Sequence, residues 1–389
     1  MRGGKVVTYL RSVALSNQEL QQYARHLNLP DFTRETQEKL KSARVLVVGA
    51  GGLGSPLLLY LAAAGIGTIG IIDPDIVTKS NLQRQILYGH SDLQLAKVSQ
   101  ADEVLSDLNP YIEINTYEEP LTVDNALDII KDYDIVADGT DNFPTRYLVN
   151  DACVILSKPN VYASIYQYEG QVAVFNYISE DGAKSPNYRD LYPEPPKDGL
   201  VPDCATGGVL GVLAGIIGTQ QALEVIKLVT GIGEPLVGKV LIYDSLSSES
   251  RIMRLRKKSS TTVTELINYD DFCGVTEPIS SNSEVMKEIT VQELQQWKES
   301  GKEFQLVDVR EAHEYEFVNL GGDLIPLGEI ISRADEISED KEVVLMCRSG
   351  QRSGAAVGAL TQQGKQNLYN LKGGVLAWAR EIDTSLPTY

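Results

Sequence analysis

The chain has 389 residues, a hydrophobic fraction of 43% and a formal net charge of -18 at pH 7. This length predicts two domains, and the acidic balance argues against nucleic acid and membrane surfaces as partners, because both require a basic footprint. The four cysteines show no C-x-x-C spacing, so they predict neither a disulfide framework nor a zinc site. With no apolar run long enough for a membrane span, we expect a cytoplasmic protein.

Two helices are expected before the first strand. Ser16 and Glu19 have the spacing of a capping box, which predicts a helix that continues through Arg25. A second helix covers about 33–42. On this placement alone, Arg25 is a solvated surface charge.

A glycine-rich turn follows a buried strand at residues 44–55, which read RVLVVGAGGLGS. An apolar helix is expected over 56–64, and a second strand over 68–72 ends at Asp73, nineteen residues after Gly54. In this context the glycines predict a nucleotide-binding turn, and the acid is placed to reach a ribose hydroxyl.

Two cations, Arg84 and Lys97, come soon after the ribose acid. A dinucleotide has little need of them, because helix-end amides largely satisfy its pyrophosphate. A triphosphate undergoing transfer requires Arg or Lys where charge develops. The pattern therefore favours ATP over NAD.

Further strands at 112–117 and 134–137 alternate with helices, which predicts a Rossmann-like, doubly wound and mostly parallel α/β sheet. Asp141 follows the second of these strands, at the edge where such sheets bind ligands. Its carboxylate could hold magnesium on the phosphates. Alternatively, Asp141 or Asn142 caps the next helix.

Strands are also expected at 160–164 and 171–177, before a long loop at 179–206 that is typical of a functional lid or a disordered segment. Cys204 lies at the end of this loop, just before a long apolar helix that stops at Gly231. A helix N-terminus stabilises a thiolate, so Cys204 is placed as a nucleophile would be. The alternative is a semi-buried, inert thiol.

The predicted boundaries are 1–256 for the first domain, 257–287 for a charged, Ser/Thr-rich linker and 288–389 for a smaller α/β domain. Cys273 lies in the linker and Cys153 on the apolar face of a helix. Both are expected to pack rather than react.

A second cysteine motif begins where the predicted strand 343–346 ends at Cys347. The turn behind it leads into a helix and comprises Arg348, Ser349, Gly350, Gln351 and Arg352. Inward-facing amides and a helix N-terminus would form an anion cradle that keeps the sulfur ionised. Four residues separate Cys347 from Arg352, a ring that suits a sulfane sulfur, whereas related phosphatase loops have five.

Together these motifs resemble a known family. The first two-thirds of the chain resembles the MoeB/ThiF adenylating enzymes, relatives of ubiquitin-activating enzymes, and the segment from residue 288 onward resembles a rhodanese. The whole chain is similar to the fused MoeZ-type proteins. Three further stretches support this: Val201–Cys204, Asp271–Gly274, and Leu371–Gly374 with Trp378 after it.

The resemblance implies roles for individual residues. Asp141 would bind magnesium, Cys347 would carry a persulfide, and Cys204 matches the loop cysteine of the adenylation domain. Arg25, within Tyr23-Ala24-Arg25, would reach the nucleotide of the other subunit, which implies a homodimer and replaces the surface-charge interpretation. The implied ATP contacts are Gly52, Asp73, Ser80, Asn81, Leu82, Gln83, Arg84, Lys97, Asp141 and Asn142.

The implied activity has two steps. ATP adenylates the C-terminal glycine of a small ubiquitin-like sulfur carrier ending in Gly-Gly, and persulfide sulfur from Cys347 then converts this terminus to a thiocarboxylate. The donor would be a cysteine desulfurase or thiosulfate, and a flexible linker would let the rhodanese reach the adenylate. Cys204 would either resolve an acyl-disulfide or form a thioester.

Other interpretations remain open at this point. Molybdenum cofactor (molybdopterin), thiamin, cysteine and tRNA thiolation pathways would all use this chemistry. An NAD-dependent oxidoreductase with a regulatory sulfurtransferase module and a non-catalytic scaffold that binds a carrier protein are the alternatives.

The chain departs from many of its relatives at their structural zinc site, which uses two C-x-x-C pairs. Here Asn187 and Asp190 stand in the places of the first pair, and the second pair is absent near 258–262. We therefore expect no zinc.

Overall fold

The computed structural model describes residues 14–195, 208–258, 263–273 and 286–387. It divides into two compact units, residues 1–276 and 277–389. The division falls inside the segment 257–287 that the sequence predicts as a linker, and each unit is described by itself below.

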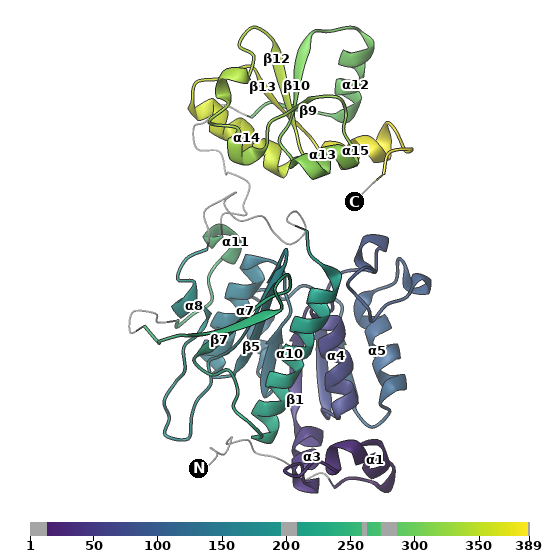
Figure 1. Ribbon diagram of the computed structural model, residues 1–389, viewed down its shortest axis with the longest axis vertical. Helices are drawn as coiled ribbons and strands as arrows, with labels where there is room; N and C mark the ends of the chain where they lie inside the picture. The colour runs from purple at the N-terminus through teal and green to yellow at the C-terminus, as the bar shows by residue number, and fades with distance from the viewer. Residues whose placement is uncertain (1–13, 196–207, 259–262, 274–285, 388–389) are drawn as a thin grey trace. The chain divides into compact units, whose positions relative to one another are not determined.

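The first unit is built on an eight-stranded sheet with the order β3-β2-β1-β4-β5-β6-β7-β8 (Figure 1). The first five strands in this order are parallel, and Val48 at the end of β1 pairs with both Ile72 and Asp138. The carboxyl ends of the central strands therefore lie level at one edge, which confirms the doubly wound prediction. These strands are β1 (Arg44–Val48), β2 (Thr68–Ile72), β3 (Glu113–Tyr117), β4 (Ile135–Asp138) and β5 (Asn160–Tyr166).

Helices cover both faces of this sheet because its strands are apolar on both sides. In β1, Val45 and Val47 belong to the core beneath α4 and α10, whereas Leu46 and Val48 belong to the core beneath α7. Figure 1 shows α4 and α10 side by side on one face. The helices are α1 (Asn17–Gln22), α2 (Ala24–Leu27), α3 (Arg34–Ser42), α4 (Gly54–Ala64), α5 (Lys97–Leu108), α6 (Ala126–Ile130), α7 (Phe143–Leu156), α8 (Tyr188–Leu191), α10 (Gly211–Thr230) and α11 (Tyr269–Phe272), with short 3-10 helices η1 (Lys79–Asn81) and η2 (His90–Asp92).

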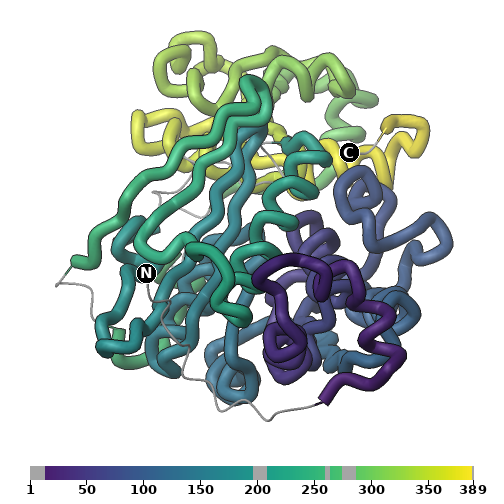
Figure 2. The backbone as a smooth tube through the Cα atoms, turned by 60° about the horizontal axis from the view of Figure 1, so that its bottom comes forward, coloured from purple at the N-terminus to yellow at the C-terminus, as the bar shows by residue number. Residues whose placement is uncertain are grey.

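The remaining three strands of the sheet are antiparallel. They are β6 (Glu169–Phe175), β7 (Lys239–Asp244) and β8 (Glu249–Arg254). Figure 2 shows β7 and β8 as a long hairpin. Neither β7 nor β8 is predicted from the sequence. All six residues of β8 are exposed, so this edge strand lacks the apolar and polar alternation that reveals a half-buried strand.

A buried polar network fastens α8 and α11 to α7. Asp151 on α7 accepts two hydrogen bonds from the guanidinium of Arg189, at 2.9 and 2.7 Å, and one from the hydroxyl of Tyr269 at 2.8 Å. The same guanidinium lies 4.6 Å from the ring centroid of Phe272. Part of the predicted linker therefore packs against the first unit, and so does part of the predicted 179–206 loop.

Helix α10 is, among the described residues, the one helix long and apolar enough to cross a membrane. Half of its most apolar window is buried inside the structure. Leu213, Ile217 and Val225 belong to the core shared with α4 and the sheet, which is the ordinary reason for such a composition in a core helix.

The second unit has a five-stranded parallel sheet with the order β11-β10-β12-β13-β9. Helix α14 packs on one face, and α12 and α15 pack on the other. The strands are β9 (Glu288–Ile289), β10 (Phe304–Asp308), β11 (Asp323–Leu324), β12 (Glu342–Met346) and β13 (Leu368–Leu371). The helices are α12 (Val291–Glu299), α13 (Ala312–Phe317), α14 (Gln351–Gln362) and α15 (Gly374–Glu381), with 3-10 helices η3 (Leu327–Glu329) and η4 (Ala334–Glu336).

The Asp151 network generates a stability prediction. Tyr269→Phe removes one hydrogen bond from a buried carboxylate and should lower the free energy of unfolding by about 1–3 kcal/mol. Tyr60→Phe is the matched control, because Tyr60 is 58% exposed. Urea unfolding of the full chain checks this, and equal midpoints for the two variants would show that the network contributes nothing.

Candidate functional site

The glycine turn of the first unit is tightly closed. Gly49 leaves β1 with a φ of +94°, and a Cβ atom added to Gly54 would lie 2.1 Å from the carbonyl oxygen of Gly49. Only glycine fits at position 54, and α4 begins there. The turn therefore brings the N-terminus of an eleven-residue helix to the carboxyl edge of the sheet, the arrangement that binds phosphate.

Asp73 follows β2 and is held against this turn. Its Oδ2 atom accepts a hydrogen bond from the Ala50 N–H at 2.8 Å, and Oδ1 accepts one from the Asp75 N–H at 2.9 Å. Burial raises the pKa of Asp73, although the Lys97 ammonium and the two amides oppose this effect. The predicted ribose acid thus lies beside the predicted phosphate turn.

The two predicted cations lie at the same edge. A Cβ atom at Gly52 would contact the Arg84 side chain at 3.2 Å, so these two residues are neighbours. Lys97 is only 4% exposed, and its Nζ atom lies 2.8 Å from Asp75 and 3.7 Å from Asp73. The structure therefore brings Gly52, Asp73, Arg84 and Lys97 together around one turn.

The loop that carries Arg84 packs between this turn and α10. Ser80 and Asn81 lie in η1, and the Oδ1 atom of Asn81 accepts a hydrogen bond from the Thr78 N–H at 3.3 Å. Leu82 packs against the apolar core, and Gln83 contacts the first residue of α10. The loop is thus anchored on both sides of the candidate nucleotide site.

The first turn of α7 shows whether Asp141 or Asn142 caps this helix. The Oδ1 atom of Asn142 accepts a hydrogen bond from the Thr145 N–H at 2.9 Å, so Asn142 is the cap. The Asp141 carboxylate is exposed at the carboxyl edge. Within the described residues, no cluster of three or more His, Cys, Asp or Glu side chains could hold a metal. Magnesium at Asp141 therefore remains a prediction.

Two side chains that the sequence analysis missed hold this edge together. Gln221 is fully buried in α10, and its Nε2 atom donates to the carbonyl oxygens of Asp138 at 2.8 Å and Val161 at 2.7 Å. The Tyr88 hydroxyl donates to the carbonyl oxygen of Ala50 at 2.8 Å. A glutamine within a long and mostly apolar helix was the available signal for the first contact.

Of the remaining catalytic candidates of the first unit, Arg25 lies within the described residues and is not placed at the turn. Arg25 lies on α2 and is exposed, consistent with either a surface charge or a contact to a second subunit. Cys204 lies outside the described residues. Of the other thiols, Cys153 is fully buried, and burial raises its pKa. Burial also raises the pKa of Cys273 to about 11, although Arg189 opposes this effect.

The cysteine loop of the second unit curls around a buried sulfur. Cys347 is 1% exposed, and the Gly350 N–H points at its Sγ atom from 3.1 Å. Gly350 has a φ of +97°, and a Cβ atom there would lie 3.2 Å from the Leu371 carbonyl oxygen. The carbonyl oxygen of Cys347 accepts a hydrogen bond from the Val375 N–H at 2.9 Å, so the start of α15 supports the loop.

One of the two arginines in this loop is paired with a carboxylate. Arg352 forms a bidentate ion pair with the carboxylate of Glu314 on α13, with both distances at 2.7 Å. This pair offsets the Arg352 charge and ties the loop to α13. Arg348 is partly exposed, and Ser349 and Gln351 are exposed.

Two further polar side chains lie beside the sulfur. The Ser353 hydroxyl oxygen is 3.4 Å from the Sγ atom of Cys347 and 2.7 Å from the Oδ1 atom of Asn370. Both residues are buried. The predicted cradle ended at Arg352 and included neither of them.

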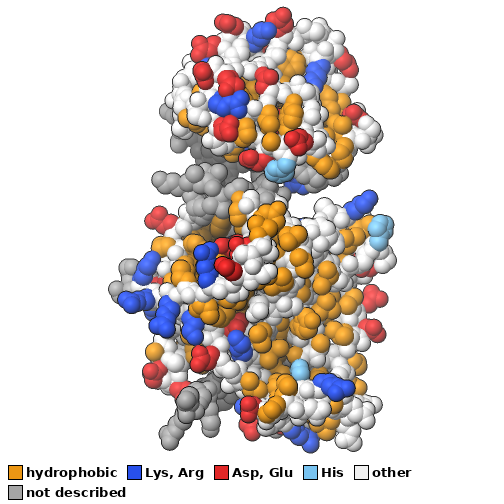
Figure 3. Space-filling view, in the orientation of Figure 1, with side chains coloured by type: hydrophobic (Ala, Val, Ile, Leu, Met, Phe, Trp, Pro, Cys, Tyr) orange, Lys and Arg blue, Asp and Glu red, His pale blue; other side chains and the backbone are white. Residues whose placement is uncertain are grey.

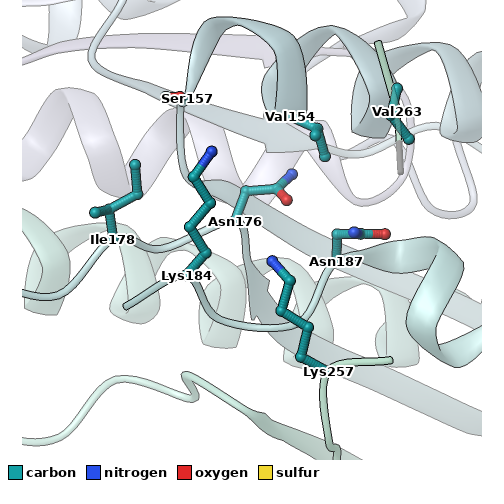
Figure 4. A pocket seen from close by; sticks show the side chains of 8 residues that line it. All are labelled: Val154, Ser157, Asn176, Ile178, Lys184, Asn187, Lys257 and Val263. Carbon is teal, nitrogen blue, oxygen red and sulfur yellow. The ribbon is translucent and has the colours of Figure 1, made fainter. Parts of the chain in front are cut away.

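A cavity of about 170 Å³ lies elsewhere on the first unit, beyond the end of α7 that is opposite to Asp141 (Figure 4). It is therefore separate from the nucleotide turn. Its lining residues are Val154, Ser157, Asn176, Ile178, Lys184, Asn187, Lys257 and Val263.

Hydrogen bonds beside this cavity join the two segments that correspond to the C-x-x-C pairs of the relatives. Asp190 accepts from the N–H groups of Asn187 and Lys258, both at 2.8 Å. The carboxylate therefore links the two segments directly, while the absence of zinc remains a prediction.

These sites define a nucleotide-binding α/β unit joined to a second α/β unit built around a buried cysteine loop. The ThiF family model matches residues 23–264, and the model of the rhodanese-like domain matches residues 290–381. The chain belongs to the ThiF family and carries a C-terminal rhodanese-like domain, which confirms the resemblance seen in its motifs.

Named relatives extend over nearly the whole chain. It is 46% identical over 380 residues to "Probable adenylyltransferase/sulfurtransferase MoeZ" of Mycobacterium tuberculosis, covering 97% of each chain. It is 41% identical over 396 residues to "Adenylyltransferase and sulfurtransferase MOCS3" of Drosophila sechellia, covering 96% of this chain and 86% of that one. These relatives support the adenylyltransferase and sulfurtransferase interpretation and not the NAD-dependent oxidoreductase.

Solved structures share the fold of the first unit. E. coli MccB with AMPCPP and MccA has a TM-score of 0.55 at 21% identity, covering 63% of this chain and 74% of that one. E. coli MccB with ATP has a TM-score of 0.53 at 22% identity, covering 64% and 75%. At this identity the likeness is one of fold.

The turn geometry predicts that replacing glycine by alanine has different effects on stability at two positions. Gly54→Ala should lower the free energy of unfolding by about 1–3 kcal/mol or more, because the added methyl meets backbone that cannot move aside. Gly215→Ala on α10 has no atom within 4 Å of its new Cβ and should be neutral or stabilising by up to about 1 kcal/mol. Thermal unfolding compares the two, and equal stabilities would contradict the described turn.

Proposed function

We infer that this protein is an adenylyltransferase and sulfurtransferase. It adenylates the C-terminal glycine of a small ubiquitin-like sulfur carrier with ATP and then converts that terminus to a thiocarboxylate. The observation that carries this inference is the presence, in one chain, of a glycine turn grouped with an acid and two cations and of a buried cysteine whose sulfur faces the Gly350 amide of its loop.

In the first step, the ribose of ATP binds beside Asp73 and the phosphates lie over the turn at Gly52. The terminal carboxylate of the carrier attacks the α-phosphorus, and the bond to the departing pyrophosphate breaks. Arg84 and Lys97 offset the charge that develops on the phosphates. In the free protein, the Lys97 ammonium lies 2.8 Å from the Asp75 carboxylate. When ATP binds, Lys97 exchanges this contact for a phosphate oxygen, which requires only a local movement of its side chain.

Magnesium fits this site at Asp141. Its carboxylate is exposed at the carboxyl edge, and the neighbouring Asn142 already caps α7, so Asp141 is not required for the cap. A bound magnesium ion would reduce the negative charge of the phosphates. Asp141 would supply an oxygen ligand to this ion from the turn that precedes α7.

A homodimer would complete the site. Arg25 is exposed on α2, and in the family pattern it reaches the nucleotide of the other subunit. The face formed by α4 and α10 displays apolar side chains (Figure 3), including Tyr60, Val212 and Leu223 at 58%, 63% and 44% exposure. Such a face suits a second copy or a protein substrate. A cytoplasmic location fits this chemistry.

In the second step, Cys347 carries a persulfide loaded by a donor such as a cysteine desulfurase or thiosulfate. The terminal sulfur attacks the carbonyl carbon of the acyl-adenylate, AMP departs, and an acyl-disulfide forms. If Cys204 attacks the Cys347 sulfur, the carrier leaves as a thiocarboxylate and a Cys204–Cys347 disulfide remains for a thiol reductant to reopen. Alternatively, Cys204 first forms a thioester.

The division of labour between the units is testable with two variants. Asp141→Ala should reduce carrier-dependent exchange of pyrophosphate into ATP by at least about 100-fold, because a magnesium ion on the phosphates would lose its carboxylate ligand. Cys347→Ala should leave this exchange intact and stop thiocarboxylate formation. Exchange assays with labelled pyrophosphate check both, and a loss of exchange in Cys347→Ala would contradict the assignment.

A further inference from the structure

The sheet of the second unit places Cys347 and Asn370 on one face. Asn370 pairs with Leu345 on the neighbouring strand, and Cys347 lies two residues beyond Leu345. Because side chains alternate along a strand, Asn370, Leu345 and Cys347 all point toward α14. Ser353, on the first turn of α14, lies between the sulfur and the amide.

The Ser353 hydroxyl has one hydrogen and two acceptors. Its oxygen lies 2.7 Å from Oδ1 of Asn370 and 3.4 Å from Sγ of Cys347. A hydroxyl donates to one acceptor at a time. A neutral thiol does not need this hydrogen, whereas a thiolate sulfur accepts a charge-assisted hydrogen bond.

The orientation of Asn370 makes it a competitor for that hydrogen. Its Nδ2 atom lies 3.5 Å from a carboxylate oxygen of Glu288, which can only accept a hydrogen bond. The amide therefore presents Oδ1, an acceptor, to Ser353. Gly350 differs in kind, because its N–H is fixed by the backbone and points at the sulfur in either state.

We propose that Ser353 is a rotating hydrogen-bond donor to the Cys347 sulfur, and that Asn370 is a positioning residue that competes for its hydrogen. When the thiol ionises, the hydroxyl turns from Asn370 to Sγ and stabilises the thiolate that accepts sulfur from a donor. Removing Ser353 and removing the Asn370 acceptor then have opposite effects on the thiolate. A purely structural role for the two residues predicts effects of the same sign.

These substitutions leave all charged side chains on the surrounding elements in place. These side chains comprise the pairs Arg352–Glu314, Arg310–Asp308 and Lys372–Glu288, together with Arg348 in the loop. Asn370→Leu also removes the amide contact with Glu288, and the double variant separates this effect, which would persist without Ser353, from the loss of the acceptor.

The test is the pH profile of Cys347 alkylation by iodoacetamide in the full chain, followed by mass spectrometry of the peptide that contains Cys347. Ser353→Ala should move the midpoint of the profile up by about one pH unit, the value of one charge-assisted hydrogen bond. Asn370→Leu should move it down by about half a unit, because the hydroxyl loses its other acceptor. In the double variant, Asn370→Leu should add no shift to that of Ser353→Ala.

Two matched controls lie in the same unit. Thr361→Ala removes a hydroxyl from the same helix that donates to the Val357 carbonyl oxygen, and Asn367→Ala removes an amide just before β13. Neither should move the profile. Circular dichroism verifies folding, and Asn370→Ala replaces Asn370→Leu if the latter does not fold.

The proposal is overturned by an unchanged midpoint in Ser353→Ala or by shifts of the same sign in the two single variants. It is equally overturned if the Asn370→Leu shift persists without Ser353. The measurement uses neither ATP nor a carrier, so its failure is separate from a failure of the adenylation chemistry.

Discussion

The first unit depends on the close packing of backbone at Gly49 and Gly54. Because this turn closes without any side chain inside it, α4 starts directly above the end of β1. The level ends of β1, β2 and β4 then place Asp73 on one side of the turn and Asp141 beyond the other. The Ala50 N–H to Asp73 hydrogen bond fastens the acid to the turn. A nucleotide would therefore meet groups that are already in place, which is the economical way to stabilise developing charge.

The second unit also depends on a close backbone turn, which here surrounds the Cys347 sulfur. There too a parallel strand ends at the carboxyl edge of its sheet, and a turn with a left-handed glycine leads into a helix. The turn surrounds a sulfur atom, with Gly350 as a fixed donor and Ser353 as a movable one. Both halves of the proposed reaction thus rely on backbone amides at the start of a helix, in one unit for phosphate and in the other for sulfur.

Most of the helices, strands and turns that could be predicted follow from patterns among residues close together in the sequence. The capping box at Ser16 forms the expected bonds, and α10 ends at Gly231 in a left-handed conformation. These features depend on residues within four positions of each other. The same reason explains why β1, the glycine turn and β2 could be predicted: residue spacing and composition over a short stretch indicate them.

What the sequence could not settle depends on contacts between distant segments. Glu314 lies 38 residues from Arg352 in the sequence, yet it pairs with that side chain and changes the charge of the sulfur loop. Asn370 is 17 residues from Ser353 and is recognisable as its partner only once β13 lies beside β12. The exposed strand β8 gives no apolar alternation, so its pairing with β7 is also visible only in the folded chain.

The central claim is that one chain both activates a carboxyl terminus and delivers sulfur to it. Intact-mass spectrometry of a Gly-Gly carrier, incubated with the enzyme, ATP and a persulfide donor, tests this most directly. The account predicts the mass increase that replacement of one terminal oxygen by sulfur produces, and it predicts that this increase requires both ATP and Cys347. A carrier that stays unchanged under these conditions, or that gains sulfur equally without ATP, would contradict it.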